Sequence, residues 1–131
     1  MQTTIALNAI KSLRKKNINP TLIHMPSIKP IDKDLIIKQA KKHKTLITFE
    51  DHNIYGGLGS AVCEVTSKHF PIKVVMMGLK DEIGRSGEAK QLLKKYKLDE
   101  TALIQKILRL KINLDAKLFR PGWCFLNLPP W

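Results

Sequence analysis

Short apolar segments alternate with amphipathic segments along most of this sequence, and that alternation most constrains its fold. Apolar residues recurring every three or four positions predict helices, and short β-branched runs predict strands. The predicted helices cover 3–14, 32–42, a segment starting near 59 or 60, 88–96 and a segment after 99, and the predicted strands cover 21–25, 45–49 and 72–79. This order predicts an α/β fold, a three-layer α/β/α arrangement with a mostly parallel sheet.

The start of the sequence departs from the usual order of such folds. A sheet of this kind normally opens with a strand, whereas the first element predicted here is a helix from residue 3. We therefore expect the first strand to be missing from this chain. An upstream segment would supply that strand, and this chain would then be a truncated piece of a longer protein.

The regular pattern fades beyond about Ile112. Residues 113–131 are rich in proline and aromatic side chains, and they resemble neither a helix nor a regular strand. We expect one domain at 1–112 and an atypical tail at 113–131. The tail's Trp123, Phe125 and Trp131 are expected to pack on the domain or on a partner.

The charge balance is the most unusual bulk property of the 131 residues. Lysine and arginine number 23 against 11 acidic residues, a formal charge of +12. Such a chain attracts anionic partners, but the lysines recur on every predicted helix and few aromatic residues alternate with them. A solvated surface is therefore favoured over nucleic-acid binding. Without an apolar run of about 20 residues or a signal sequence, we expect a cytoplasmic, non-membrane protein.

The strongest candidate site is the loop after the strand at 45–49, which is polar and then rich in glycine. Ligands collect beyond the carboxyl ends of parallel strands, and the N–H groups of a helix start attract anions. The candidate anion or interface site consists of Glu50, His52, Asn53, Gly56, Gly57, Gly59 and Ser60. Neither a complete dinucleotide motif nor a phosphate loop is present, so a tight turn and a close helix–sheet approach are the favoured interpretation.

Catalytic chemistry has weaker support. Glu50, Asp51 and His52 could supply a general acid or base, with Ser60 or Cys63 as nucleophile. Side chains adjacent at a strand end diverge, however, so adjacency is poor support for an active site. The four histidines are scattered without metal-ligand spacing, and the two cysteines are expected to be free thiols, so we expect no metal-binding residue and no catalytic residue.

Three stretches of the sequence closely resemble the C-terminal domain of transketolases, in order and in spacing. The resemblance runs from about residue 4 to 107, and the glycine-loop stretch is its most specific part. The three stretches are Ile23–Asp32, Thr48–Val62, and Gly78–Asp81 followed by Ser86-Gly87.

The resemblance implies a role inside a larger enzyme. Transketolases use thiamine diphosphate and a divalent metal to move a two-carbon ketol unit between sugar phosphates in the pentose phosphate pathway. Their C-terminal domain holds neither the cofactor nor the catalytic residues; it provides scaffolding and dimer contact. The implied partners are the cofactor-binding domains, in the same or a separate chain, within a homo-oligomer. Related domains complete deoxyxylulose phosphate synthases and 2-oxoacid dehydrogenases, but the loop looks most like transketolase itself.

Three departures from the family pattern accompany the resemblance. The strand that opens the family domain is missing, and the tail from about Asn113 has no counterpart. Lys97 stands where the family usually has a glycine, which would end the preceding helix in a left-handed conformation without steric cost.

Two other hypotheses remain open. The chain is alternatively a stand-alone module that binds an anionic metabolite or nucleic acid, as its charge and its helix-start loop suggest. It is otherwise a small enzyme that uses His52 with Glu50 or Asp51.

Overall fold

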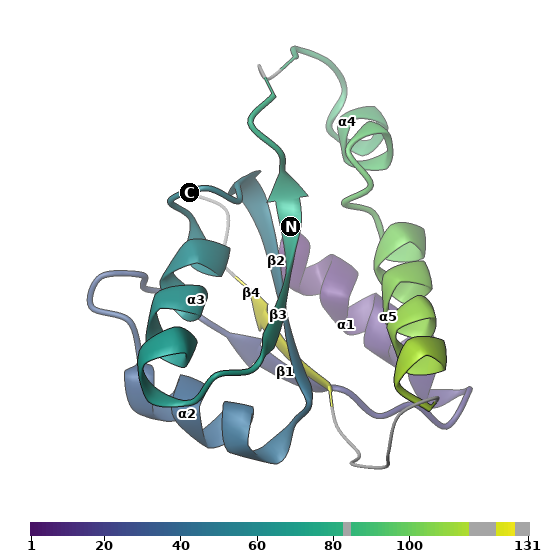
Figure 1. Ribbon diagram of the computed structural model, residues 1–131. Helices are drawn as coiled ribbons and strands as arrows, with labels where there is room; N and C mark the ends of the chain where they lie inside the picture. The colour runs from purple at the N-terminus through teal and green to yellow at the C-terminus, as the bar shows by residue number, and fades with distance from the viewer. Residues whose placement is uncertain (83–84, 116–122, 128–131) are drawn as a thin grey trace.

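The computed structural model describes residues 1–82, 85–115 and 123–127. Three layers make up the molecule: a parallel sheet lies between two layers of helices (Figure 1). The elements in chain order are α1 (Gln2–Arg14), β1 (Thr21–His24), α2 (Lys33–Lys42), β2 (Thr45–Asn53), α3 (Leu58–His69), β3 (Lys73–Leu79), α4 (Ala89–Lys95), α5 (Glu100–Asp115) and β4 (Trp123–Asn127). The α/β fold and the parallel sheet predicted from the sequence are confirmed.

Two aspartates begin helices where the sequence predicts caps. The Asp32 side chain accepts the backbone N–H of Leu35 at 2.9 Å at the start of α2. Asp99 likewise accepts the N–H of Ala102 at 3.0 Å at the start of α5. Such caps satisfy N–H groups that have no partner inside the helix.

Lys97 adopts the left-handed conformation that its place in the sequence suggests. Its φ is +57°, directly after α4 ends, and the backbone N–H of Leu98 bonds back to the carbonyl of Leu93 at 2.8 Å. A glycine usually ends a helix in this way. Because lysine has a Cβ atom, the left-handed conformation costs it conformational free energy.

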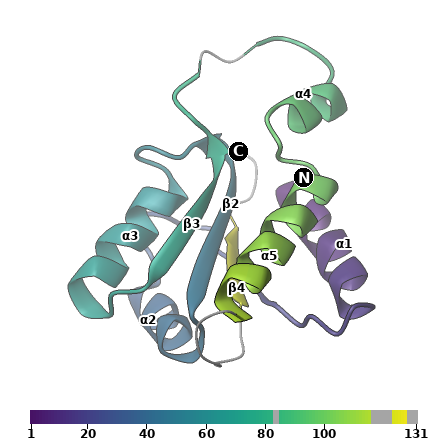
Figure 2. The same cartoon turned by 45° about the vertical axis from the view of Figure 1, so that its right-hand side comes forward.

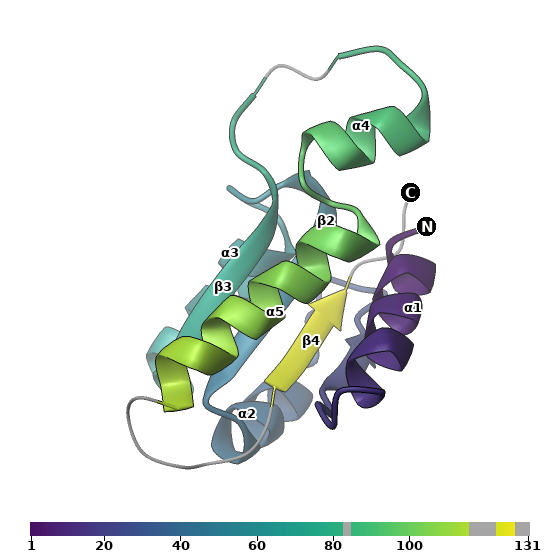
Figure 3. The same cartoon turned by 90° about the vertical axis from the view of Figure 1, so that its right-hand side faces the viewer.

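Each face of the sheet has its own apolar core. On one face α1 and α5 contribute Leu13 and Ile107, which pack with Phe49 and Met77 from the sheet. On the other face α2 and α3 contribute Ile36 and Val62, which pack around Leu46. Figures 2 and 3 show these two helix pairs on opposite sides of the strands.

The sheet order β1-β4-β2-β3 tests two expectations from the sequence, the missing first strand and the irregular tail. The chain begins with α1, as predicted, but the interior of the sheet has no vacant place because β4 lies between β1 and β2. Residues 113–115 continue α5 and 123–127 form a strand, so the expectation of an irregular segment is wrong for these residues. Prolines on both sides and the short length of β4 hid its pattern in the sequence.

Strand β2 also differs from its predicted length. The sequence pattern ends the strand at residue 49, whereas β2 continues to Asn53, and its pairing with β3 shifts register between Phe49 and Asn53. Residues 50–53 are polar, so apolar periodicity could not show that they extend the ladder.

Within the described residues, no helix is long and apolar enough to cross a membrane.

Candidate functional site

The carboxyl end of β2 and the start of α3 form the candidate site, and Glu50 is its centre. Glu50 is fully buried, and its two carboxylate oxygens accept the backbone N–H groups of Leu58 at 2.7 Å and Gly59 at 2.9 Å. These are the first N–H groups of α3, which have no partner within the helix. A side chain of the protein itself therefore occupies the position that an anion would need.

Two glycines make room for this contact. A Cβ atom at Gly57 would collide with Oε2 of Glu50 and lie 2.5 Å from the carbonyl oxygen of Asn53. A Cβ atom at Gly59 would lie 2.5 Å from Cγ and Sδ of Met76 on β3. The predicted close approach of helix to sheet is thus found at both positions.

Asn53 shapes the turn that follows β2. Its Oδ1 accepts the backbone N–H of Tyr55 at 3.0 Å, an arrangement that closes a tight turn. Its Nδ2 donates to Oδ1 of Asp81 at 3.3 Å, which ties the loop to the segment after β3. Sequence spacing gave no indication of Asp81, because the contact joins residues 28 positions apart.

Ser60 closes the other side of the loop. Its hydroxyl donates to the carbonyl of Ile54 at 2.9 Å and accepts the backbone N–H of Gly56 at 2.9 Å. Gly56 has φ +75°, a conformation that glycine adopts at no steric cost. The serine hydroxyl therefore has a structural role on both its donor and its acceptor side.

The potential catalytic groups are not arranged as a nucleophile and its base. His52 is exposed, and its Nδ1 lies 3.1 Å from the carbonyl oxygen of its neighbour Asn53. Asp51 is also exposed, whereas Glu50 is directed to α3. Since the Ser60 hydroxyl bonds to Ile54, the interactions found here do not support the small-enzyme hypothesis.

Burial and hydrogen bonding act in opposite directions on the Glu50 carboxyl. Burial raises its pKa above the ordinary value near 4.5, while the N–H groups of Gly59 and Leu58 and the nearby His52 oppose that rise. The removal of the carboxylate from water outweighs these partners.

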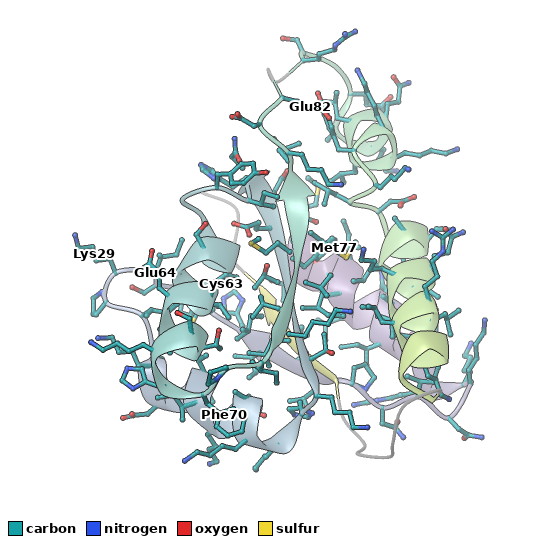
Figure 4. All side chains as sticks on the ribbon, viewed as in Figure 1. Lys29, Cys63, Glu64, Phe70, Met77 and Glu82 are labelled. Carbon is teal, nitrogen blue, oxygen red and sulfur yellow. The ribbon has the colours of Figure 1, made fainter. Side chains whose placement is uncertain are left out.

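Cys63 lies on α3, one turn beyond the loop, and is half-buried as a free thiol. Figure 4 labels it beside Glu64 on this helix. Burial raises the pKa of its thiol, which makes it a poorer nucleophile at neutral pH. Within residues 1–82, 85–115 and 123–127, no three histidine, cysteine or acidic side chains gather as metal ligands.

The basic residues are partly organised by the helix directions. The last turns of three helices that precede parallel strands carry Lys11 and Arg14, Lys41 and Lys42, and Lys68 and His69. The carbonyl end of a helix carries a partial negative charge, which these cations offset. Part of the positive charge therefore has a structural explanation in the helices themselves.

Exposed groups remain on the outer side of the loop. Tyr55 is 64% exposed, and the exposed Asp51, His52 and Gly56 are within four positions of it in the sequence. Of the predicted site residues, the structure brings Glu50, Gly57 and Gly59 together around the helix start. His52 lies outside that buried cluster, available for contact with another surface.

Comparisons with known proteins agree with the fold. The family model "Transketolase, C-terminal domain" matches residues 1–103. A "Putative transketolase C-terminal section" of Methanocaldococcus jannaschii is 42% identical over 104 residues, which are 79% of this chain and 32% of that protein. A 1-deoxy-D-xylulose-5-phosphate synthase of Clostridium tetani is 40% identical over 106 residues, which are 80% of this chain and 17% of that enzyme.

A solved structure is similar over the same region. A split-gene transketolase, described as an inactive beta4 tetramer, aligns with a TM-score of 0.76 and 38% identity. The alignment covers 82% of this chain and 35% of that one, so the chain spans about a third or less of the length of these relatives. The chain belongs to the transketolase C-terminal domain family.

Proposed function

We propose that this chain is the C-terminal structural and dimer-contact section of a transketolase-like enzyme that transfers a two-carbon ketol unit between sugar phosphates. The family match over residues 1–103 carries the proposal. A relative named as a separate transketolase C-terminal section, and a similar structure from a split gene, support a role as one section of an assembly. In this role the chain alone has no activity, and the assembly works in the cytoplasm.

The cofactor of the whole enzyme, thiamine diphosphate with a divalent metal, binds to other sections under this proposal. A diphosphate needs free N–H donors such as those of a helix start. At the start of α3, the N–H groups of Leu58 and Gly59 already bond to Glu50, whose negative charge repels a phosphate. The candidate loop does not fit the cofactor.

The outer side of the loop serves instead as a contact surface for the cofactor-binding domains or for a second copy. Tyr55 supports this role, because an exposed tyrosine brings a large apolar ring and a hydrogen-bonding hydroxyl to an interface. The buried bonds of Glu50 and Ser60 hold the turn rigid beneath it. A preformed surface loses little conformational entropy on association.

A second reaction deserves the same test, because a relative with 40% identity is named 1-deoxy-D-xylulose-5-phosphate synthase. The two reactions differ in their substrates, while the role proposed for this domain is the same in both. Assaying both reactions in the reconstituted assembly distinguishes them.

Reconstitution with the cofactor-binding sections encoded by the same organism tests the proposal. We expect the mixture to form a complex on size exclusion and to show ketol transfer, with neither component active alone. Tyr55→Ala should weaken the complex, whereas Leu7→Ala, at a 47% exposed position on α1, should not. Tight binding of thiamine diphosphate to this chain alone, measured by calorimetry, would contradict the proposed division of roles.

A stand-alone module that binds an anionic metabolite or nucleic acid is the remaining alternative, favoured by the charge of +12. A filter-binding titration with nucleic acid at increasing salt separates the two functions. Phosphate contacts release counterions, so true nucleic-acid binding weakens steeply as salt rises. We expect no salt-sensitive binding at physiological ionic strength.

A further inference from the structure

Two strands that follow one another in the chain are not neighbours in the sheet. β1 and β2 are connected through α2, but β4 lies between them and is parallel to both. Phe125 of β4 is in register with Leu22 on one side and with Ile47 on the other. The position between β1 and β2, called here the interior slot, therefore accepts one parallel strand.

The strand in the interior slot contributes to the core. Leu126 is fully buried and packs in the cluster that includes Ile23 on β1, Ile36 on α2 and Leu46 on β2. An empty slot would expose these apolar neighbours and leave backbone groups of both flanking strands unpaired.

The handedness of the helical crossovers indicates which helix and strand the strand in the interior slot is connected with. From β1 through α2 to β2, and on through α3 to β3, the chain advances one way across the sheet, and both helices cover the same face. Crossovers between parallel strands are right-handed, so a step in the opposite direction must pass over the opposite face. α1, which leads into β1, lies on that opposite face (Figure 2).

The carboxyl end of β4 and the start of α1 lie at the same edge of the sheet. β4 is parallel to β1, so its carboxyl end lies at the same edge of the sheet as His24. The start of α1 is at that edge too, with Oγ1 of Thr3 lying 3.4 Å from Nδ1 of His24. Figure 3 shows the tip of β4 and the first turn of α1 at this edge.

We infer that β4, α1 and β1 form a right-handed βαβ unit in permuted chain order, in which residues 123–127 act as the strand before α1. The interior slot is a binding site for one strand, and its occupant is this chain's own C-terminal segment. This inference concerns how the domain is completed, and it does not depend on the proposed enzymatic role.

A circular permutant of the 131-residue chain tests the inference. Joining residue 131 to residue 1 through a short Gly/Ser linker and opening the chain between 116 and 117 puts β4 directly before α1. We expect the circular dichroism spectrum of the wild type and a thermal midpoint within a few degrees of it. A permutant that folds but leaves residues 123–127 rapidly exchanging with solvent would overturn the inference.

Measurements on the unpermuted chain decide the matter if the permutant does not fold. The backbone amides of 124–126 should exchange as slowly as those of 46–48 in β2. Leu126→Ala should raise the equilibrium constant for unfolding by roughly 30-fold or more. The matched control Leu7→Ala, at an exposed position, should change it less than about threefold.

Three results contradict the inference. Exchange of the 124–126 amides within seconds would show that the strand is not in the slot. Equal effects of the two leucine substitutions would show that Leu126 is not part of the core. Protection that is lost when a dimer is diluted would show that a second copy delivers the strand.

Discussion

The carboxylate of Glu50, on β2, accepts the first free N–H groups of α3, with 2.7 Å between its Oε2 and the backbone nitrogen of Leu58. This contact holds the helix start against the sheet from inside the protein. The buried N–H groups of Leu58 and Gly59 already have a partner in Glu50, so only the outer side of the loop remains for contact with other molecules.

Replacing the Glu50 carboxyl by an amide should destabilise the fold in a pH-dependent way. Glu50→Gln keeps one acceptor but turns an NH₂ group toward a backbone donor, which should cost about 1–3 kcal/mol. Burial raises the folded-state pKa of Glu50 above about 4.5, so its contribution to stability is fully present below the unfolded pKa and is lost as the pH rises through the folded pKa. Urea unfolding from pH 4 to pH 7 should therefore show the difference between wild type and variant shrinking as the pH rises.

The control for this experiment is Glu64→Gln, at an exposed position on α3. It should change stability by less than about 0.5 kcal/mol at every pH. A difference between wild type and Glu50→Gln that grows with rising pH would contradict the raised pKa.

Gly59→Ala should be destabilising by about 1–3 kcal/mol, because the new Cβ would lie 2.5 Å from Met76. The matched control is Gly87→Ala, whose Cβ would meet Leu92 at an ordinary distance of 3.4 Å. That control should be neutral within about 0.5 kcal/mol. Thermal unfolding of both variants measures the contrast, and equal midpoints would refute the close approach of α3 to β3.

Lys97→Gly should be stabilising by about 1 kcal/mol, because a left-handed residue without a Cβ avoids the clash with the following carbonyl. Lys94→Gly, within α4, should instead cost about 1 kcal/mol of helix propensity. Denaturant unfolding of the two variants should give shifts of opposite sign. Shifts of the same sign would mean that Lys97 is not under backbone strain.

Cys63 should react slowly with iodoacetamide at neutral pH in a Cys124→Ser background, because burial raises its thiol pKa and limits access. The rate should increase as the pH approaches and passes 9, where more thiolate forms. The same variant in urea is the control and should react at the rate of a free cysteine. Equal rates in the folded and unfolded states would contradict the burial of Cys63.

Local sequence patterns were enough to predict the elements that have local causes. Apolar residues at three- and four-residue spacing predicted α1, α2 and α5. The aspartates before α2 and α5 predicted where these two helices begin. The glycines of the loop indicated a close approach, and the family resemblance singled out Lys97 as left-handed. These features depend on residues within a few positions of one another, so the linear sequence contains them.

Contacts between segments that are far apart in the sequence could be found only in the folded structure. Glu50 looked like a candidate for acid–base chemistry, but its bonds to Leu58 and Gly59 make it a helix cap. The strand at 123–127 is too short and too irregular to stand out, and it becomes regular only because β1 and β2 supply hydrogen bonds on both sides. Strand pairing is non-local, so its free energy depends on which segments meet and not on the local pattern of either one.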